Sequence, residues 1–116
     1  MPERPIIVAG AGVGGLSAAL ALARAGRYAI VLERAPALAE FGAGLQLGPN
    51  ATRRLANWGA LDRLKDLATA PQGVDIRSAR NGSVIASLPV GDAERRWGAP
   101  YLVAHRADLL TALADA

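Results

Sequence analysis

The first third of the chain alternates between short apolar runs and segments of small residues. Residues 5–9 form a β-branched run without a polar side chain, which is typical of a central parallel strand buried on both faces. Residues 16–25 are mostly Ala and Leu and predict a helix, which Gly26 ends in the left-handed conformation. Residues 28–33 predict a second buried strand with an acidic residue, Glu33, at its carboxyl end. The pattern therefore predicts a βαβ unit.

The middle of the chain changes from a glycine-rich pattern to a helical one. Residues 34–41 are expected to form a loop, and residues 42–48 form a glycine-rich strand. Asn50 is the expected N-cap of a helix that stops at Gly59. A second short helix is expected to place four apolar side chains in the core: Leu61, Leu64, Leu67 and Ala68.

The last third predicts a hairpin and a final strand and helix. Asn81-Gly82 lies between the apolar runs at residues 74–77 and 84–88, and this dipeptide is the strongest short hairpin signal. With a strict two-residue loop, apolar residues of one strand share a face with polar residues of the other. This mixed register indicates a bulge or two half-covered faces. Residues 101–105 are expected to be extended, and residues 106–114 are expected to form a helix.

The glycine-rich turn after the first strand has a pattern with chemical meaning. In the sequence GAGVGG at residues 10–15, Gly10 permits a tight exit from the strand and Gly12 lets backbone approach a pyrophosphate. Gly15 allows the helix and the strand to pack closely. The free amides around Val13 and Gly14 are expected to face the phosphates, with the positive end of the helix dipole behind them.

Glu33 completes this pattern. It lies 18 residues beyond Gly15, at the end of the second strand, where its carboxylate is expected to accept hydrogen bonds from both hydroxyls of an adenosine ribose. Strand, glycine turn, helix, strand and acid together indicate adenine dinucleotide binding. They do not choose between NAD and FAD.

Composition excludes several other classes of protein. At 116 residues and with 52% apolar residues, the chain is long enough for one packed domain and too short for a two-domain enzyme. It has no cysteine, which excludes disulfides and thiolate metal sites and fits the cytoplasm. The net charge is +3, but basic residues never form a cluster longer than two, and there are only five aromatic residues. A nucleic-acid surface is therefore not expected. No apolar run is long enough to span a membrane.

Four segments beyond the glycine motif point to a family. They are Leu-Glu-Arg at residues 32–34, GAGLQLGPNA at 42–51, WGALD at 58–62 and PYLVAHRADL at 100–109. With these segments the chain resembles the N-terminal part of class A FAD-dependent aromatic monooxygenases, particularly the salicylate hydroxylase and 3-hydroxybenzoate 6-hydroxylase group. The resemblance extends over essentially all 116 residues.

The resemblance implies a cofactor, a reaction and a set of binding residues. It implies FAD as cofactor, NADH or NADPH as electron donor, and hydroxylation of an aromatic acid or phenol with dioxygen. Gly44, Leu45 and Gln46 would lie near the ribityl and isoalloxazine parts of FAD, and Arg106 near the ribityl and pyrophosphate. No catalytic residue and no metal ligand is expected in this chain. The full set of expected cofactor-binding residues is Gly10, Gly12, Val13, Gly14, Gly15, Glu33, Arg34, Gly44, Leu45, Gln46 and Arg106.

The expected fold class is α/β, namely the N-terminal part of a Rossmann-like FAD-binding fold. Residues 1–116 are expected to form part of a single FAD-binding domain that is incomplete at Ala116, without a substrate domain and inactive by itself. A small aromatic substrate is the expected partner, and a homodimer stays open for the complete protein. Three other functions also stay open: another FAD oxidoreductase such as an epoxidase or oxidase, an NAD-dependent dehydrogenase, and a non-catalytic dinucleotide-binding module.

Overall fold

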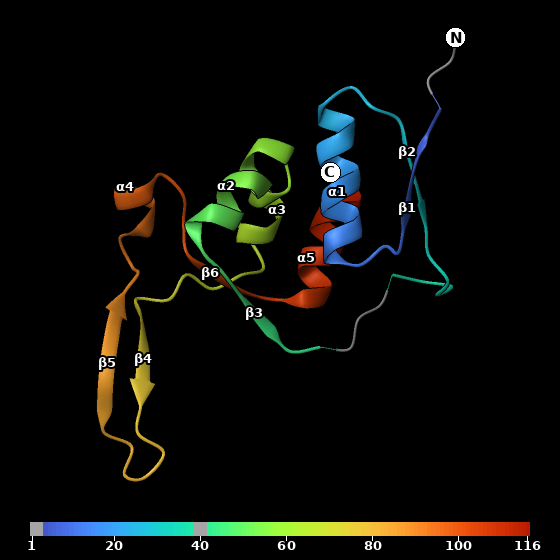
Figure 1. Cartoon of the computed structure of the whole chain (residues 1–116). Helices are drawn as coiled ribbons and strands as arrows, with labels where there is room; N and C mark the ends of the chain where they lie inside the picture. Colours follow the sequence, from blue (N-terminus) through green and yellow to red (C-terminus); the bar gives the residue numbers. More distant parts are fainter. Residues whose placement is uncertain (1–3, 39–41) are drawn as a thin grey trace.

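Helices and strands are mixed along the chain in a computed structural model that describes residues 4–38 and 42–116. This mixed arrangement confirms the α/β class (Figure 1). The elements in chain order are β1 (Ile6–Ala9), α1 (Val13–Arg24), β2 (Ala29–Leu32), β3 (Gly44–Leu47), α2 (Pro49–Trp58), α3 (Leu61–Lys65), β4 (Gly73–Arg77), β5 (Val84–Pro89), α4 (Ala93–Trp97), β6 (Leu102–His105) and α5 (Arg106–Asp115).

The predicted βαβ unit is present at the N-terminal end. β1 and β2 are parallel neighbours, and α1 packs against both strands and against α5 (Figure 1). Gly26 has a φ of 72°, and the N–H groups of Gly26 and Arg27 donate to the carbonyls of Ala23 and Leu22. These two bonds satisfy carbonyls at the end of α1, so the predicted glycine stop is confirmed.

The prediction of strands buried on both faces is wrong for this unit. No residue of β1 or β2 is buried, and the side chains of Ile7 and Leu32 are 55% and 56% exposed. The sheet that they form has two strands, and α1 covers one of its faces. Within the described residues nothing comparable covers the other face, so the apolar pattern alone does not bury these side chains.

The hydrophobic core lies beyond the βαβ unit, between Leu47 and Leu113. It is formed by β3 and β6, which pair antiparallel, together with α2, α3 and α5. Val13, Leu16 and Leu20 of α1 pack against its edge. The buried core residues are Leu47, Leu55, Ala60, Leu61, Leu64, Leu102, Ala104, Leu109, Ala112 and Leu113.

Two local predictions for α2 and α3 need correction. The helix α2 begins at Pro49 and its N-cap is Gly48, so Asn50 lies inside the helix. Proline suits the first helical position because its φ is already helical and its missing N–H is not needed there. Leu67 is 56% exposed, because α3 ends at Lys65 and the helical spacing does not continue to this residue. Gly59 ends α2 with a φ of 80°, as predicted.

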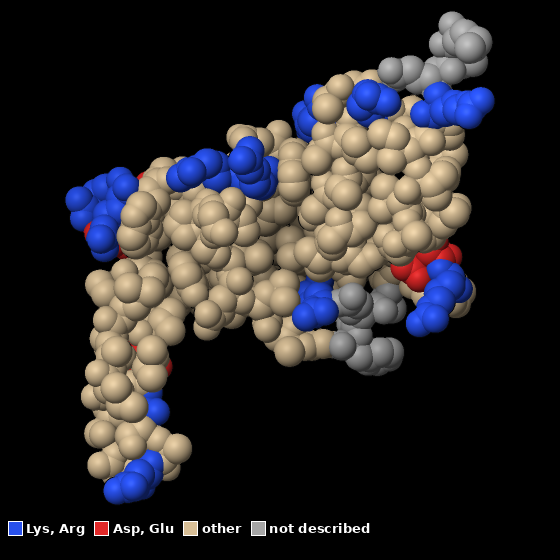
Figure 2. Space-filling view, in the orientation of Figure 1, with Lys and Arg blue, Asp and Glu red and all other residues tan. Residues whose placement is uncertain are grey.

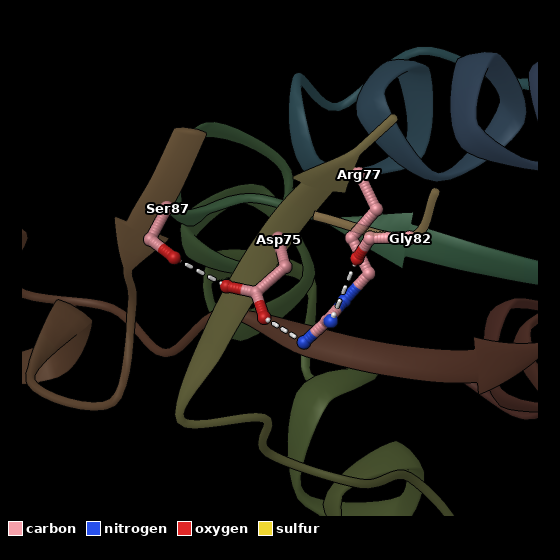
Figure 3. A network of polar contacts seen from close by, with 4 residues as sticks. All are labelled: Asp75, Arg77, Gly82 and Ser87. Carbon is pink, nitrogen blue, oxygen red and sulfur yellow. Dashed lines mark hydrogen bonds and ion pairs between the residues drawn. The ribbon is translucent and has the colours of Figure 1, made fainter. Parts of the chain in front are cut away.

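The predicted hairpin is confirmed, with a longer loop than two residues. β4 and β5 are antiparallel, and the register shifts between Ile76 and Arg77. This bulge confirms the interpretation drawn from the mixed register. On the polar face Arg77 contacts the Asp75 carboxylate at 3.0 Å and the Gly82 carbonyl at 3.3 Å, and the Ser87 hydroxyl donates to Asp75 (Figure 3). The opposite face carries Ile76 and Leu88, which are 59% and 55% exposed.

The hairpin projects away from the rest of the molecule (Figure 1). The radius of gyration is therefore 17.0 Å, whereas a globular chain of this length is expected near 13 Å.

The short helix α4, which follows the hairpin, was not predicted; Gly98 ends it with a φ of 75°. The described part of the expected loop, residues 34–38, has no helix or strand, and residues 39–41 lie outside the described residues. No helix in the described ranges is long and apolar enough to cross a membrane.

Candidate dinucleotide site

Two of the motif glycines are required by the chain itself. Gly10 has a φ of 100°, a conformation that other residues rarely adopt. A Cβ atom on Gly15 would lie 1.8 Å from the carbonyl oxygen of Gly10, so no side chain fits between α1 and the end of β1. The close packing expected at Gly15 is therefore present, and it brings the first turn of α1 against the strand.

The other motif glycines border open space. Apart from its neighbours in the sequence, a Cβ atom on Gly12 or Gly14 would have no atom of the described residues within 4 Å. Gly12 is the N-cap of α1 without a side-chain cap, and the first turn has no acidic residue. The N–H groups of Val13, Gly14 and Gly15 find no acceptor among the described residues. Because these donors are combined with the positive end of the helix dipole, the turn suits an anionic group such as a pyrophosphate.

Glu33 lies against this turn. One oxygen of its carboxylate accepts the N–H of Ala11 at 2.8 Å, and the other accepts the N–H of Ala35 at 3.0 Å. These bonds, Ala35 first and Ala11 second, hold the pKa of Glu33 below its ordinary value, against a smaller opposing effect of desolvation. The carboxylate therefore stays charged, and its remaining lone pairs can accept hydrogen bonds from sugar hydroxyls.

Two adjacent pockets lie around Glu33 and Arg34. One, of about 840 Å³, is lined by the ends of β1 and β2 and includes Gly10. The other, of about 230 Å³, joins Gly12 and Glu33 to Leu110 of α5. In Figure 2 a red patch lies next to a blue one in the region where β2 ends. Elsewhere on that face the blue side chains form separate groups, not a continuous stripe.

A second group of expected site residues gathers where β3 meets α5. Gly44 pairs with His105 across the β3–β6 ladder, so Arg106 directly follows the residue opposite Gly44. A Cβ atom on Gly42 would lie 3.6 Å from the Cβ of Arg106. A Cβ atom on Gly44 would meet nothing closer than 3.7 Å, so the packing of the chain does not demand glycine there. The glycine backbone at Gly42 and Gly44 therefore lies beside Arg106.

Helix α5 connects the two groups. Leu110 lines the pocket beside Gly12 and Glu33, and Arg106 lies four residues earlier, on the same side of the helix. The structure thus brings the glycine turn, Glu33 and Arg34 together, and it brings Gly44 close to Arg106. Leu45 is half-buried toward the core, whereas Gln46 is exposed on the other face of β3.

Sequence reasoning missed several residues that shape this site. The N–H of Ala11 on Glu33 is a contact between residues 22 positions apart, and no pattern in the sequence signals it. Ala37, Leu38 and Leu110 line the smaller pocket but carry no distinctive chemistry. The polar groups of the site nevertheless fit FAD. The N–H groups that find no acceptor among the described residues suit a pyrophosphate, the charged carboxylate suits a ribose, and the glycine backbone beside Arg106 suits the rest of the molecule.

Comparison with known proteins agrees with this geometry. The family described as FAD binding domain matches residues 3–113. The 3-hydroxybenzoate 6-hydroxylase of Polaromonas naphthalenivorans (strain CJ2) is 43% identical over 114 residues, which cover 97% of this chain and 28% of that protein.

Solved structures agree as well. The tetrameric form of 2-methyl-3-hydroxypyridine-5-carboxylic acid oxygenase has a TM-score of 0.81 and 29% identity, covering 99% of this chain and 29% of that one. Klebsiella pneumoniae HpxO, solved with FAD and uric acid, has a TM-score of 0.78 and 28% identity, covering 98% and 28%. The chain thus spans less than a third of the length of these relatives. Since the family match includes nearly every residue, the chain belongs to the FAD binding domain family, in the group of class A FAD-dependent aromatic monooxygenases.

Proposed function

We propose that residues 1–116 form the N-terminal portion of a single FAD-binding domain and hold FAD along the side of the molecule that runs from the glycine turn to β3. The observation that carries this proposal is the first turn of α1. Its three N–H groups, which have no acceptor among the described residues, border open space at Gly12, next to a carboxylate that is kept charged. A dinucleotide supplies the anion and the ribose hydroxyls that such a site needs.

Each part of the site has a separate proposed task. The amides at Val13 and Gly14 bind the pyrophosphate. Glu33 accepts hydrogen bonds from the hydroxyls of the adenosine ribose, with Arg34 beside it. Gly44, Leu45 and Gln46 lie along the flavin end, and Arg106 binds near the ribityl and pyrophosphate. FAD is favoured over NAD because the proposed site extends beyond the first βαβ unit. There the glycine backbone of β3 lies next to Arg106 and leaves room for the flavin half of FAD.

The proposed reaction belongs to the complete protein. We propose hydroxylation of a small aromatic acid or phenol, with NADH or NADPH as electron donor and dioxygen as the oxygen source. The supporting observation is the similarity to the hydroxylase and the oxygenase named above. FAD, when bound, supplies the redox chemistry. The residues of this chain bind the cofactor, orient it and hold its charged groups.

The first experiment measures binding to the chain itself. We expect FAD to bind to the 116-residue chain more tightly than ADP, because ADP lacks the flavin half that β3 and Arg106 would contact. Isothermal titration with each ligand gives both affinities under the same conditions. Equal affinities would contradict the flavin part of the site. Binding of neither ligand, both by this chain and by the chimera described below, would contradict the proposed function as a whole.

The second experiment tests the reaction. In a chimera, this chain replaces the matching N-terminal segment of the Polaromonas 3-hydroxybenzoate 6-hydroxylase, with which it is 43% identical. We expect the chimera to retain FAD and to hydroxylate 3-hydroxybenzoate, and the same chimera with Gly12→Val to do neither. A chimera that retains FAD but forms no hydroxylated product would favour a non-catalytic dinucleotide-binding module.

Assembly and location complete the proposal. We propose that the complete protein forms a homo-oligomer, with a dimer as the simplest form; one similar solved structure is described as tetrameric. The absence of cysteine fits a cytoplasmic location. Light scattering on the complete protein measures the number of subunits directly.

A further inference from the structure

Gln46 is a proposed flavin contact whose side chain is held by another residue. The hydroxyl of Tyr101 donates to the Oε1 atom of Gln46 at 2.9 Å. Gln46 lies on β3, and Tyr101 immediately precedes β6, the antiparallel partner of β3. The bond therefore joins two segments that are 55 residues apart in the sequence.

A glutamine amide has two chemically different ends. Its carbonyl oxygen only accepts hydrogen bonds, and its NH₂ group only donates them. Because the Tyr101 hydroxyl occupies the oxygen, the NH₂ group is the end that Gln46 offers to a ligand. The edge of an oxidised flavin ring carries one N–H donor and several acceptors, namely two carbonyl oxygens and unprotonated ring nitrogens, so most of its positions match a fixed donor.

We propose that Tyr101 is a positioning residue that fixes the Gln46 amide so that its NH₂ group is presented to the flavin half of FAD. This inference rests on the proposed function, since it deepens the assignment of Gln46. Without the Tyr101 hydroxyl, the amide is free to rotate and to present its oxygen to flavin atoms that are themselves acceptors.

The backbone next to Tyr101 is anchored from the core. Thr52 is fully buried, and its hydroxyl donates to the carbonyl oxygen of Pro100 at 2.7 Å. This bond connects α2 to the residue before Tyr101. The Tyr101 ring itself lines a surface pocket of about 380 Å³ with Pro49, Leu88 and Trp97, outside the core cluster. Loss of its hydroxyl is therefore expected to leave the packing of the core unchanged.

The test compares FAD with ADP on variants of the 116-residue chain. Tyr101→Phe should weaken FAD binding about three- to tenfold, the effect of one hydrogen bond, and leave ADP binding unchanged. Tyr28→Phe is the matched control, because Tyr28 is 64% exposed and precedes β2, at the end of the strand opposite Glu33. It should change neither affinity.

A double-mutant cycle separates positioning from a direct contact. If Tyr101 acts through Gln46, then Tyr101→Phe should have no further effect on FAD binding in a Gln46→Ala background. Thr52→Val, which removes the anchor at Pro100, should weaken FAD binding in the same direction and spare ADP. Far-ultraviolet circular dichroism confirms that each variant keeps its helix content.

Several results would overturn the inference. An unchanged FAD affinity in Tyr101→Phe, an equal loss of FAD and ADP affinity, or an additive effect with Gln46→Ala would each do so. These outcomes leave the proposed function standing as long as the unaltered chain binds FAD more tightly than ADP. If neither the unaltered chain nor the chimera binds either ligand, the proposed function and this inference fail together.

Discussion

The βαβ unit and the helical half of the molecule differ in what their residues do. Among residues 4–33 only Ala11 is buried, yet this region carries the glycine motif and Glu33. The half formed by β3, α2, α3, β6 and α5 holds the core, and that core is made of Leu and Ala. The glycine motif leaves space open and Glu33 carries a charge, whereas the core residues fill space. Helix α5 takes part in both, because it packs on α1 and carries Arg106 and Leu110.

The largest expected effect of a single substitution is in the βαβ unit. Gly15→Ala places a Cβ atom 1.8 Å from the Gly10 carbonyl oxygen, which we expect to destabilise the unit by more than about 3 kcal/mol. Both tryptophans, Trp58 and Trp97, lie outside this unit. Circular dichroism should therefore lose the α1 signal while the tryptophan unfolding transition is largely kept. If both signals change together, the two regions fold as one unit.

A substitution in the core should act on the other half. Leu64 has no exposed surface, so Leu64→Ala is expected to lower the free energy of unfolding by about 2–5 kcal/mol. Leu20→Ala on α1 is the matched control, since this leucine packs only against the edge of the core. Leu20→Ala should lower the free energy of unfolding clearly less than Leu64→Ala does. Urea unfolding followed by tryptophan fluorescence measures both, and equal losses would contradict the division between the regions.

Gly12→Val separates binding from folding. Apart from the neighbours of Gly12 in the sequence, no atom of the described residues lies within 4 Å of a Cβ at this position, so helix content should be kept. The valine side chain would occupy the space proposed for the pyrophosphate, and affinity for both ADP and FAD should fall more than about a hundredfold. Ala18→Val, on an exposed position of α1, is the control for a β-branched residue in this helix. Unchanged ligand affinity in Gly12→Val would contradict the placement.

We expect Glu33 to make ligand binding depend on pH. Because its pKa in the folded chain is lowered by the Ala35 and Ala11 N–H groups, its charge stabilises the loop at pH values above the ordinary glutamate range. This contribution is lost as the pH falls through the lowered pKa. ADP affinity should therefore decrease on acidification, and Glu33→Gln should weaken binding about tenfold at neutral pH and abolish this dependence.

The control for Glu33 is another exposed glutamate. Glu94→Gln alters a carboxylate on α4, which contacts Lys65 at 3.4 Å. It should leave both the ADP affinity and its pH dependence unchanged. The same pH profile in Glu33→Gln as in the unaltered chain would assign the titration to another group.

The smallest expected effect is at Arg106. Arg106→Lys keeps the charge but loses the planar pair of donors, so FAD affinity should fall by a few-fold while ADP affinity changes less. Arg95→Lys is the control, because Arg95 pairs with Asp92 on the exposed surface of α4 at 2.8 Å. If Arg106→Lys has the same FAD affinity as the unaltered chain, Arg106 is the first residue of α5 with no role in FAD binding.

The sequence by itself determined the features that depend on neighbouring residues. The βαβ order, the stop at Gly26, the helix end at Gly59, the hairpin around Asn81-Gly82 and the final strand and helix all follow from local preference. Glycine and proline restrict the backbone at their own positions, and apolar spacing within one helix or strand shows which face is inward. The family resemblance rested on motifs of the same local kind, and the comparisons confirm it.

Only the tertiary structure decided which apolar side chains are buried and which polar groups meet. Leu64 and Leu67 have the same chemistry three residues apart, but α3 ends between them and only Leu64 reaches α5 and the core. Burial of β1 depends on what covers each face of its sheet, which its own residues do not specify. The bond from Ala11 to Glu33 and the bond from Tyr101 to Gln46 join distant segments. Such contacts depend on how the helices and strands pack, because packing alone brings residues of large sequence separation within hydrogen-bonding distance.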